Sequence, residues 1–147
     1  MIYREEIKDL FSVPNDYYLA HCISADYALG AGIAIEFNKR FDMRRKLKET
    51  APDYWKYMRL YNLQGECILI DRVLNLITKE KYYHKPSYES MKQALNMMKL
   101  VCEANNINKV AMPLLGCGLD RLEWTVVSKM ICDIFNGTNI EILVCKR

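Results

Sequence analysis

Lys79 and Asp120 have side chains and sequence positions that suit covalent catalysis. Lys79 ends an apolar run, residues 73–78, that predicts a buried strand, and Asp120 lies in a glycine-containing loop after a second apolar run. Both are therefore expected at carboxyl ends of strands, the edge of an open α/β sheet where ligands bind. A lysine amine can attack an electrophilic carbon, and a nearby carboxylate can carry protons. Spacing alone also permits a simpler interpretation, with Lys79 on the surface and Asp120 capping a helix.

Two glycine-containing loops are candidates for binding phosphate groups between these two residues. The first, residues 30–32, lies where a strand-to-loop segment turns into a predicted helix, and the second, residues 113–122, precedes a predicted helix start at Glu123. Backbone amides of such loops bind phosphate because glycine permits close approach and a helix N-terminus is positive. Two loops suggest a ligand with two phosphates, although each is also compatible with an ordinary turn. The first lacks the third glycine of the dinucleotide fingerprint, which disfavours a Rossmann dehydrogenase.

Strands and helices alternate over most of the chain, which predicts an α/β sandwich with helices on both faces of the sheet. The predicted strands are 17–23, 67–70, 73–78, 109–112 and 140–144, and the predicted helices are 33–40, 42–50, 87–105 and 125–135. A further segment, residues 52–61, mixes tyrosine and tryptophan with lysine and arginine. Such a segment indicates either an aromatic core helix or a surface on which nucleic acid bases stack.

Composition predicts one domain that spans residues 1–147, with 51% apolar residues and a net charge of +3, too small to indicate nucleic acid by itself. No apolar run approaches the roughly 20 residues of a membrane span, and the N-terminal residues lack a signal-peptide core. We therefore expect an intracellular protein without membrane association. The six cysteines form no C-x-x-C pair and only two histidines accompany them, so we predict reduced thiols and no metal site.

Five stretches of the sequence resemble one known family. They are residues 20–24 (AHCIS), 30–34 (GAGIA), 76–79 (LITK), 84–89 (HKPSYE) and 113–122 (PLLGCGLDRL). Together they are similar to macrodomains, the ADP-ribose-binding fold, and most of all to the branch that contains terminal ADP-ribose protein glycohydrolase. The resemblance implies a single macrodomain, a three-layer α/β sandwich in which a mixed central sheet lies between helices.

The resemblance also implies an activity, the removal of terminal ADP-ribose from acidic side chains of modified proteins. In that branch the lysine at the position of Lys79 is the nucleophile that attacks the distal ribose and displaces glutamate, and the aspartate at Asp120 is the acid/base that resolves the lysyl adduct. No cofactor is implied, because ADP-ribose is ligand and product, and deacetylation of O-acetyl-ADP-ribose is a second activity of this type. The implied ligand-binding residues are Asp9 at the adenine, Ser24 beside the distal ribose, and Leu10, His21, Gly30, Ala31, Gly32, Ile33, Thr78, Leu115, Gly116, Cys117, Gly118 and Leu119. Without the resemblance, His21 is interpreted as a hydrogen-bonded core histidine.

The sequence departs from the family pattern at three places. Lys8 replaces a glycine and Cys145 replaces a tyrosine, both near the expected adenine. Residues 50–66 resemble instead the aromatic-rich insert of antitoxin macrodomains, which remove ADP-ribose from thymidine in DNA. Two alternatives therefore stay open, a DNA-directed hydrolase and an ADP-ribose reader without turnover, and the presence of Lys79 and Asp120 disfavours the reader. We expect a monomer in the cytoplasm, or in the nucleus of a eukaryotic cell, with ADP-ribosylated protein as partner ahead of DNA.

Overall fold

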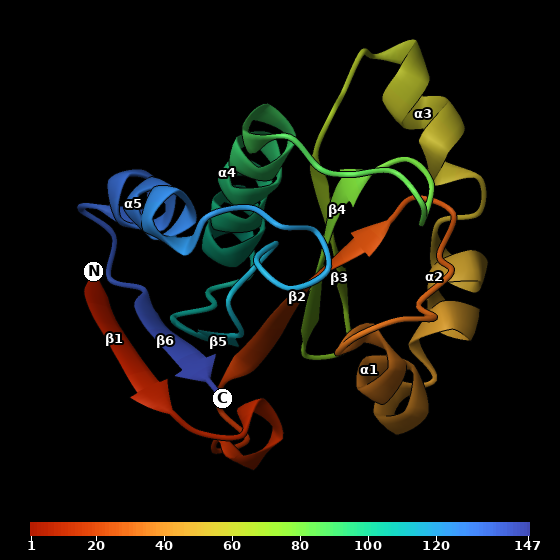
Figure 1. Cartoon of the computed structure of the whole chain (residues 1–147). Helices are drawn as coiled ribbons and strands as arrows, with labels where there is room; N and C mark the ends of the chain where they lie inside the picture. Colours follow the sequence, from red (N-terminus) through yellow and green to blue (C-terminus); the bar gives the residue numbers. More distant parts are fainter.

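A computed structural model describes all 147 residues and is built around one mixed sheet of six strands (Figure 1). The strand order is β1-β6-β5-β2-β4-β3, and every neighbouring pair is parallel except β3 and β4, which form an antiparallel hairpin. The strands are β1 (Ile2–Ile7), β2 (Tyr18–Ser24), β3 (Glu66–Ile70), β4 (Val73–Lys79), β5 (Lys109–Met112) and β6 (Glu141–Lys146). Because the five parallel strands share one direction, their carboxyl ends meet at a single edge of the sheet.

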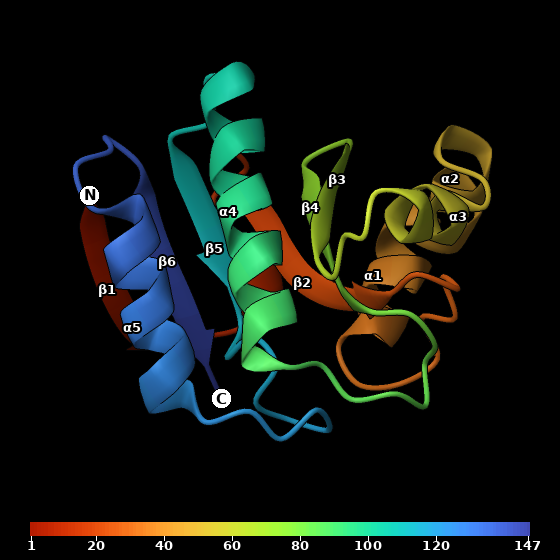
Figure 2. The ribbon, with the colours of Figure 1, turned by 90° about the horizontal axis from the view of Figure 1, so that it is seen from above.

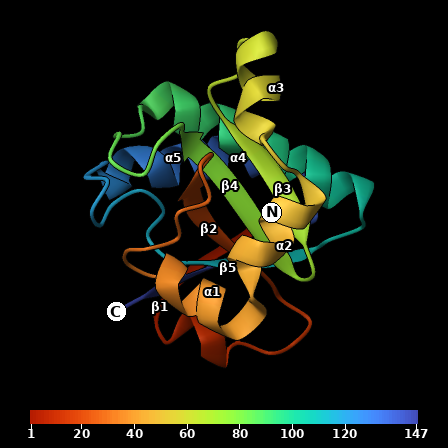
Figure 3. The ribbon, with the colours of Figure 1, turned by 90° about the vertical axis from the view of Figure 1, so that its right-hand side faces the viewer.

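Helices cover both faces of the sheet, which confirms the predicted three-layer α/β sandwich (Figures 2 and 3). On one face lie α1 (Ala34–Phe41), α2 (Met43–Thr50) and α3 (Tyr54–Leu60), and on the other α4 (Tyr88–Ala104) and α5 (Trp124–Phe135). Side chains alternate between the two faces along each strand, so that neighbouring residues enter different cores. Leu19 of β2 packs with Phe37 of α1, whereas Ala20 packs in the core that contains Met91 of α4 and Ile131 of α5.

The predicted helices and strands all occur, with ends that differ by no more than two residues from the prediction. Strand β1 was not predicted, because it lies at the sheet edge and its apolar residues are exposed rather than alternating inward: Ile2 is 59% and Ile7 86% exposed. A single 3-10 turn, Leu10–Ser12, was also not predicted. No helix is both long and apolar enough to cross a membrane.

Helix α4 begins where the sequence predicted, because Ser87 caps it. The Ser87 hydroxyl accepts a hydrogen bond from the Ser90 amide at 3.0 Å, and the Ser90 hydroxyl accepts one from the Ser87 amide at 3.0 Å. This reciprocal capping satisfies two amides that the first turn would otherwise leave without partners. It also anchors the loop that joins Lys79, at the end of β4, to α4.

Candidate active site

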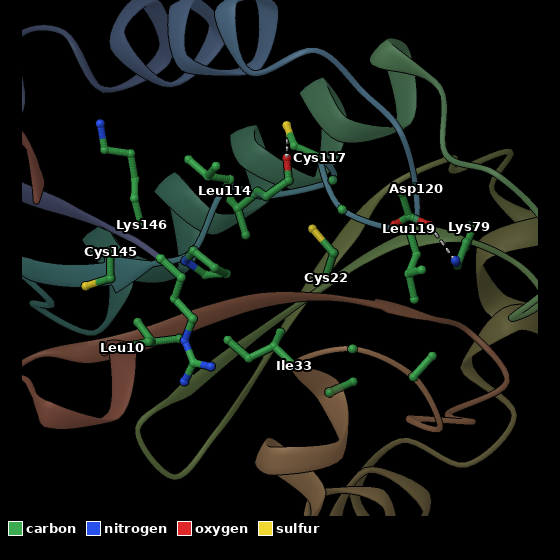
Figure 4. A pocket seen from close by; sticks show the side chains of 18 of the residues that line it. Leu10, Cys22, Ile33, Lys79, Leu114, Cys117, Leu119, Asp120, Cys145 and Lys146 are labelled. Atoms are coloured by element: carbon green, nitrogen blue, oxygen red, sulfur yellow. Dashed lines mark hydrogen bonds and ion pairs between the residues drawn. The ribbon is translucent and has the colours of Figure 1, made fainter. Parts of the chain in front are cut away.

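A cavity of about 420 Å³ lies where the carboxyl ends of β2, β4, β5 and β6 meet, within the range of small-molecule sites (Figure 4). The cavity is elongated between two ends of different character. Leu10, Cys145 and Lys146 lie at one end, and Lys79 and Asp120 lie at the other. The remaining lining residues are Lys8, Cys22, Ala31, Gly32, Ile33, Ala34, Pro113, Leu114, Leu115, Gly116, Cys117, Gly118, Leu119 and Arg147.

Lys79 and Asp120 contact each other at one end of the cavity. The Nζ atom of Lys79 donates a hydrogen bond to Oδ1 of Asp120 at 2.7 Å, and each side chain is only 15% exposed (Figure 4). Asp120 is not a helix cap, because Glu123 holds that position in α5. The low exposure of both groups excludes most water from the pair, which strengthens their electrostatic interaction.

A register shift between β2 and β4 occurs immediately before Lys79. Ile23 pairs with Ile77, but the next residue, Ser24, pairs with Lys79, so that Thr78 is an extra residue in β4. An extra residue of this kind bends the strand and changes the direction in which the following side chain points. The shift is therefore one reason why the amine of Lys79 faces Asp120, and it is a feature that periodicity in the sequence does not reveal.

The loop that carries Asp120 is held on both sides by residues that precede or begin α4. The amine of Lys85 donates to the Leu119 carbonyl at 2.7 Å, and the Tyr88 hydroxyl accepts a hydrogen bond from the Glu123 amide at 3.0 Å. Within the loop, the Leu122 amide donates to the Gly116 carbonyl at 2.8 Å. These contacts fix the backbone on either side of Asp120 and thereby position its carboxylate.

Gly116 closes this loop tightly and has no room for a side chain. Its φ of +72° is in the left-handed region, which favours glycine. A Cβ atom at this position would lie 2.7 Å from Cε of Met91 and 2.9 Å from Cδ1 of Leu122. A side chain at Gly116 would therefore displace the ends of Met91 and Leu122 and also strain the backbone, whereas a Cβ on Gly118 would meet no atom within 4 Å.

The first glycine loop has the features of a phosphate site. Ile33, the N-cap of α1, makes no side-chain capping hydrogen bond. The amides of Ile35 and Glu36 donate to the Gly32 and Ile33 carbonyls, so the Ala34 amide is the one in the first turn that lacks a backbone partner and can bind a ligand. Gly32 has a φ of +60°, and a Cβ atom on it would lie 3.9 Å from Cδ1 of Leu119, so the two loops approach each other across the cavity. The helix after the second loop begins at Trp124, as predicted, but no residue of its first turn lines the cavity.

Asp9, predicted at the adenine, lies beside the far end of the cavity without lining it. Its Oδ1 accepts a hydrogen bond from the Phe11 amide at 3.0 Å, which caps the 3-10 turn, and lies 3.6 Å from Nη2 of Arg147. The neighbouring residues Lys8 and Leu10 do line the cavity. Asp9 thus holds the turn that forms this wall.

Four other predicted ligand residues also lie outside the cavity wall: His21, Ser24, Gly30 and Thr78. His21 is fully buried, stacks on Phe37 at 3.8 Å between ring centroids, and contacts Oδ1 of Asn75 through Nε2 at 2.7 Å. Burial lowers the pKa of His21 to about 4, so the imidazole is neutral at pH 7. The interpretation of His21 as a hydrogen-bonded core histidine is therefore confirmed.

Ser24 and Thr78 are buried next to the lysine end of the cavity. The Ser24 hydroxyl donates to Oδ1 of Asp26 at 2.5 Å, and Oγ1 of Thr78 has no hydrogen-bond partner. Both residues adjoin Lys79, one across the strand pair and one along it. Both residues therefore help to position the Lys79 side chain.

Eight cavity residues were not among the predicted ligand-binding or catalytic residues: Lys8, Cys22, Ala34, Pro113, Leu114, Cys145, Lys146 and Arg147. Of these, Lys8 and Cys145 were expected near the adenine, and Pro113 and Leu114 belong to the second glycine loop. Lys146 ends β6 and Arg147 follows it, so the rule that ligands bind at carboxyl ends of parallel strands would have found both. Burial raises the pKa of the Cys22 and Cys117 thiols, which therefore stay protonated at pH 7 and are poor nucleophiles. Lys79 is thus the better nucleophile candidate. No three His, Cys, Asp or Glu side chains are grouped to hold a metal ion.

The chain has close relatives among characterised proteins. It is 40% identical over 140 residues to the human protein named ADP-ribose glycohydrolase OARD1, and 39% identical to its bovine counterpart. Each match covers 92% of this chain and 86% of the relative. A protein of Invertebrate iridescent virus 6 is 35% identical over 72 residues, 49% of this chain. No protein-family model matches the chain.

Solved structures share the fold at lower sequence identity. The macrodomain of Mycobacterium tuberculosis DarG superposes with a TM-score of 0.80 at 20% identity, covering 98% of this chain and 97% of the other. The macrodomain of Thermus aquaticus DarG has a TM-score of 0.79 at 19% identity, with 99% of both chains covered. A structure of Thermosipho africanus DarTG with ADP-ribose has a TM-score of 0.75 at 18% identity over 99% of this chain and 42% of that one. The fold is therefore that of a macrodomain.

Proposed function

The chain belongs to the OARD1 family of ADP-ribose glycohydrolases, and from this premise we propose that it removes ADP-ribose from acidic side chains of modified proteins. The observation that carries the proposal is the contact of 2.7 Å between Lys79 and Asp120 at one end of a cavity of ligand size. An amine and a carboxylate in contact supply a nucleophile and a group that moves its protons. The reaction needs no cofactor, because both groups belong to the chain.

ADP-ribose is proposed to lie along the cavity with its distal ribose at Lys79. The diphosphate then faces the backbone of residues 31–34 and of the loop at residues 114–118. The Ala34 amide at the start of α1 and the positive end of the helix dipole favour phosphate there. The adenine reaches the opposite end, where Leu10 and Cys145 provide apolar contacts and Asp9 adjoins the wall.

In the first chemical step, the Asp120 carboxylate accepts a proton from the Lys79 ammonium, from which it is 2.7 Å away. The free amine attacks the anomeric carbon C1″ of the distal ribose. A C1″–N bond forms, the C1″–O bond breaks, and its electron pair leaves with the carboxylate of the glutamate or aspartate. This leaving group needs no proton, because a carboxylate is stable at neutral pH.

In the second step, water resolves the lysyl adduct. Asp120 first releases its proton to solvent, and its carboxylate then accepts a proton from the water that attacks C1″. The C1″–N bond breaks, its electron pair returns to the Lys79 nitrogen, and Asp120 passes its proton back to the amine. The products are ADP-ribose, the free carboxylate and one proton, and the enzyme regains its initial state. O-acetyl-ADP-ribose is proposed as a second substrate, because its acyl group is carried by the same ribose.

One experiment compares the three candidate functions. The protein is incubated at one salt concentration with an ADP-ribosylated glutamyl peptide and with an oligonucleotide ADP-ribosylated on thymidine, and the release of ADP-ribose is measured. We expect faster release from the peptide, abolished by Lys79→Met. Preferential release from the oligonucleotide would establish the DNA-directed hydrolase instead. ADP-ribose binding without release from either substrate would establish a reader.

A further inference from the structure

A second hollow, of about 230 Å³, adjoins the first cavity, and Lys79 is the one residue that lines both. Helix α3 contributes Trp55, Met58 and Arg59 to its wall, and Glu80 follows Lys79 on the other side. The proposed mechanism gives this hollow no role. Because the hollow lies next to Lys79, it adjoins the place where the substrate continues beyond ADP-ribose into the modified protein.

We propose that this hollow docks the peptide segment that carries the modified side chain, and that it prefers an acidic segment. The inference rests on the proposed function. The modified side chain is attached at C1″, which must come within bonding distance of the Lys79 amine. The substrate protein must therefore leave the ADP-ribose cavity at the Lys79 end, and the second hollow is the recess that adjoins it there.

Three cations lie around the ring of Trp55, and one of them, Arg59, lines the hollow together with Trp55. Cζ of Arg59 lies 5.2 Å from the centre of the indole ring, and Nζ of Lys56 and of Lys81 each lie 5.5 Å from it. Lys81 comes from the loop after β4, so that the cluster joins α3 to the loop that follows Lys79. Cations held close together attract a segment rich in carboxylates.

The positive charge of this cluster is only partly compensated. Arg59 forms an ion pair with Glu80 at 2.5 Å, and Lys56 one with Asp53 at 3.7 Å. Lys81 forms no salt bridge, although the Asp26 carboxylate lies near enough to interact with its charge. Its amine lies beside Trp55, where it remains available to a second carboxylate. An acidic residue next to the modified one would give Lys81 a partner, whereas a basic residue would be repelled.

The aromatic residues of α3 favour a peptide over nucleic acid at this hollow. Trp55 is its one aromatic wall residue, and its ring already has cations beside it rather than the free face that a base needs for stacking. The tyrosines of α3 do not line the hollow. Instead Tyr57 lies 5.1 Å from Tyr54 and 4.8 Å from Tyr61 between ring centroids, in a row along a neighbouring face of the helix.

The test uses three substrates that differ only beyond C1″. Two are peptides with an ADP-ribosylated glutamate, flanked on both sides by aspartate in the acidic peptide and by asparagine in the neutral one. The third is a minimal substrate, in which a single capped glutamate carries the ADP-ribose. For Lys81→Glu we expect a KM on the acidic peptide about fivefold higher than for the wild type, from one lost and one repulsive surface charge contact. The KM on the minimal substrate and the Kd of ADP-ribose should not change. The increase should shrink in 0.5 M salt, because exposed charges are screened.

Two further variants make the result specific. Lys92→Glu reverses an exposed charge on α4 that lines neither cavity, and it should leave all three KM values unchanged. Trp55→Ala should raise the KM of both peptides relative to the minimal substrate, and the minimal substrate reports whether the variant is folded.

Three outcomes would overturn the docking proposal. In the first, Lys81→Glu and Trp55→Ala both leave unchanged the ratio of the KM on the peptides to the KM on the minimal substrate. The hollow then does not dock the peptide, although the proposed hydrolase activity is unaffected. If only an oligonucleotide ADP-ribosylated on thymidine responds to these variants, the hollow docks nucleic acid. If the wild type releases ADP-ribose from none of the substrates, the proposed function fails together with the docking site.

Discussion

The amine of Lys79 lies 2.7 Å from Oδ1 of Asp120, although the residues are 41 positions apart in the sequence and come from the end of β4 and the loop after β5. Each side chain is 15% exposed, so the pair is sheltered while it still borders the cavity. The pair is an amine donor in direct contact with a carboxylate acceptor. For catalysis the proton must then move from the amine to the carboxylate, and the short distance makes that transfer direct.

The first prediction concerns the two members of this pair. Lys79→Met keeps most of the side-chain length but removes the amine, and it should lower turnover of the glutamyl substrate by at least about 100-fold. The Kd of ADP-ribose should change little. Asp120→Ala should be similarly slow. Solvent can still deprotonate the Lys79 amine, whereas no other group replaces the base that activates water, so this variant should accumulate ADP-ribose on Lys79, visible as an added mass in intact-protein spectra. The double variant should be no slower than either single one, because the two groups act as a unit. Wild-type turnover in Lys79→Met would exclude the lysine mechanism.

The second prediction concerns Lys85, whose amine holds the Leu119 carbonyl at 2.7 Å and so fixes the residue before Asp120. Lys85→Met should lower kcat about three- to tenfold, the loss expected for one exposed hydrogen bond from a charged donor, with little change in the Kd of ADP-ribose. Lys85→Arg should restore part of the rate. The matched control is Lys92→Met on α4. An unchanged kcat in Lys85→Met would show that the loop is positioned without this contact.

The third prediction separates backbone strain from ligand binding. Gly32 and Gly137 both have positive φ, +60° and +82°, but only Gly32 lines the cavity. Valine at either position should destabilise the fold by about 1–2 kcal/mol, measured by urea unfolding. Only Gly32→Val should also weaken ADP-ribose binding, by about tenfold or more, because a side chain there blocks approach to the backbone amides. Equal ADP-ribose affinity in the two variants would show that the first glycine loop does not contact the phosphates.

The fourth prediction is a pH dependence of stability that arises from His21. Burial lowers its pKa from 6.5 to about 4 in the folded state, so unfolding takes up a proton whenever the pH lies between these values. Its contribution to stability is complete above pH 6.5 and is lost as the pH falls toward 4, at about 1.4 kcal/mol per pH unit. From pH 7 to pH 5 the wild type should therefore lose about 2 kcal/mol more than His21→Gln in urea unfolding.

The matched control for this measurement is His84→Gln. His84 is the other histidine of the chain and is exposed, so this variant controls for the effect of replacing a histidine by glutamine. Parallel pH profiles of the wild type and His21→Gln would show that His21 does not remain neutral in the folded protein.

Several features of the fold could be read from the sequence because they follow from local periodicity. The stripe of Met91, Leu95, Met98 and Cys102 predicted the buried face of α4, and all four residues are fully buried. The two glycine loops were likewise recognised from residue type alone, and both line the cavity. Periodicity failed for β1, because an edge strand with exposed apolar residues has no inward face to produce an alternating pattern.

Other features depended on which segments pack side by side. The sequence placed Lys79 and Asp120 at strand ends, but the sheet order, in which β2 lies between β4 and β5, decides which strand ends are neighbours. The register shift at Ser24, the contact of Lys85 with Leu119 and the position of Trp55 beside Lys79 also join residues that are distant in the chain. The sequence by itself therefore determined the helices and every strand except β1, since these follow from local spacing, and its resemblance to macrodomains supplied most of the candidate residues. Only the tertiary structure decided which of these residues meet, because long-range contacts depend on the packing of the whole sheet and its helices.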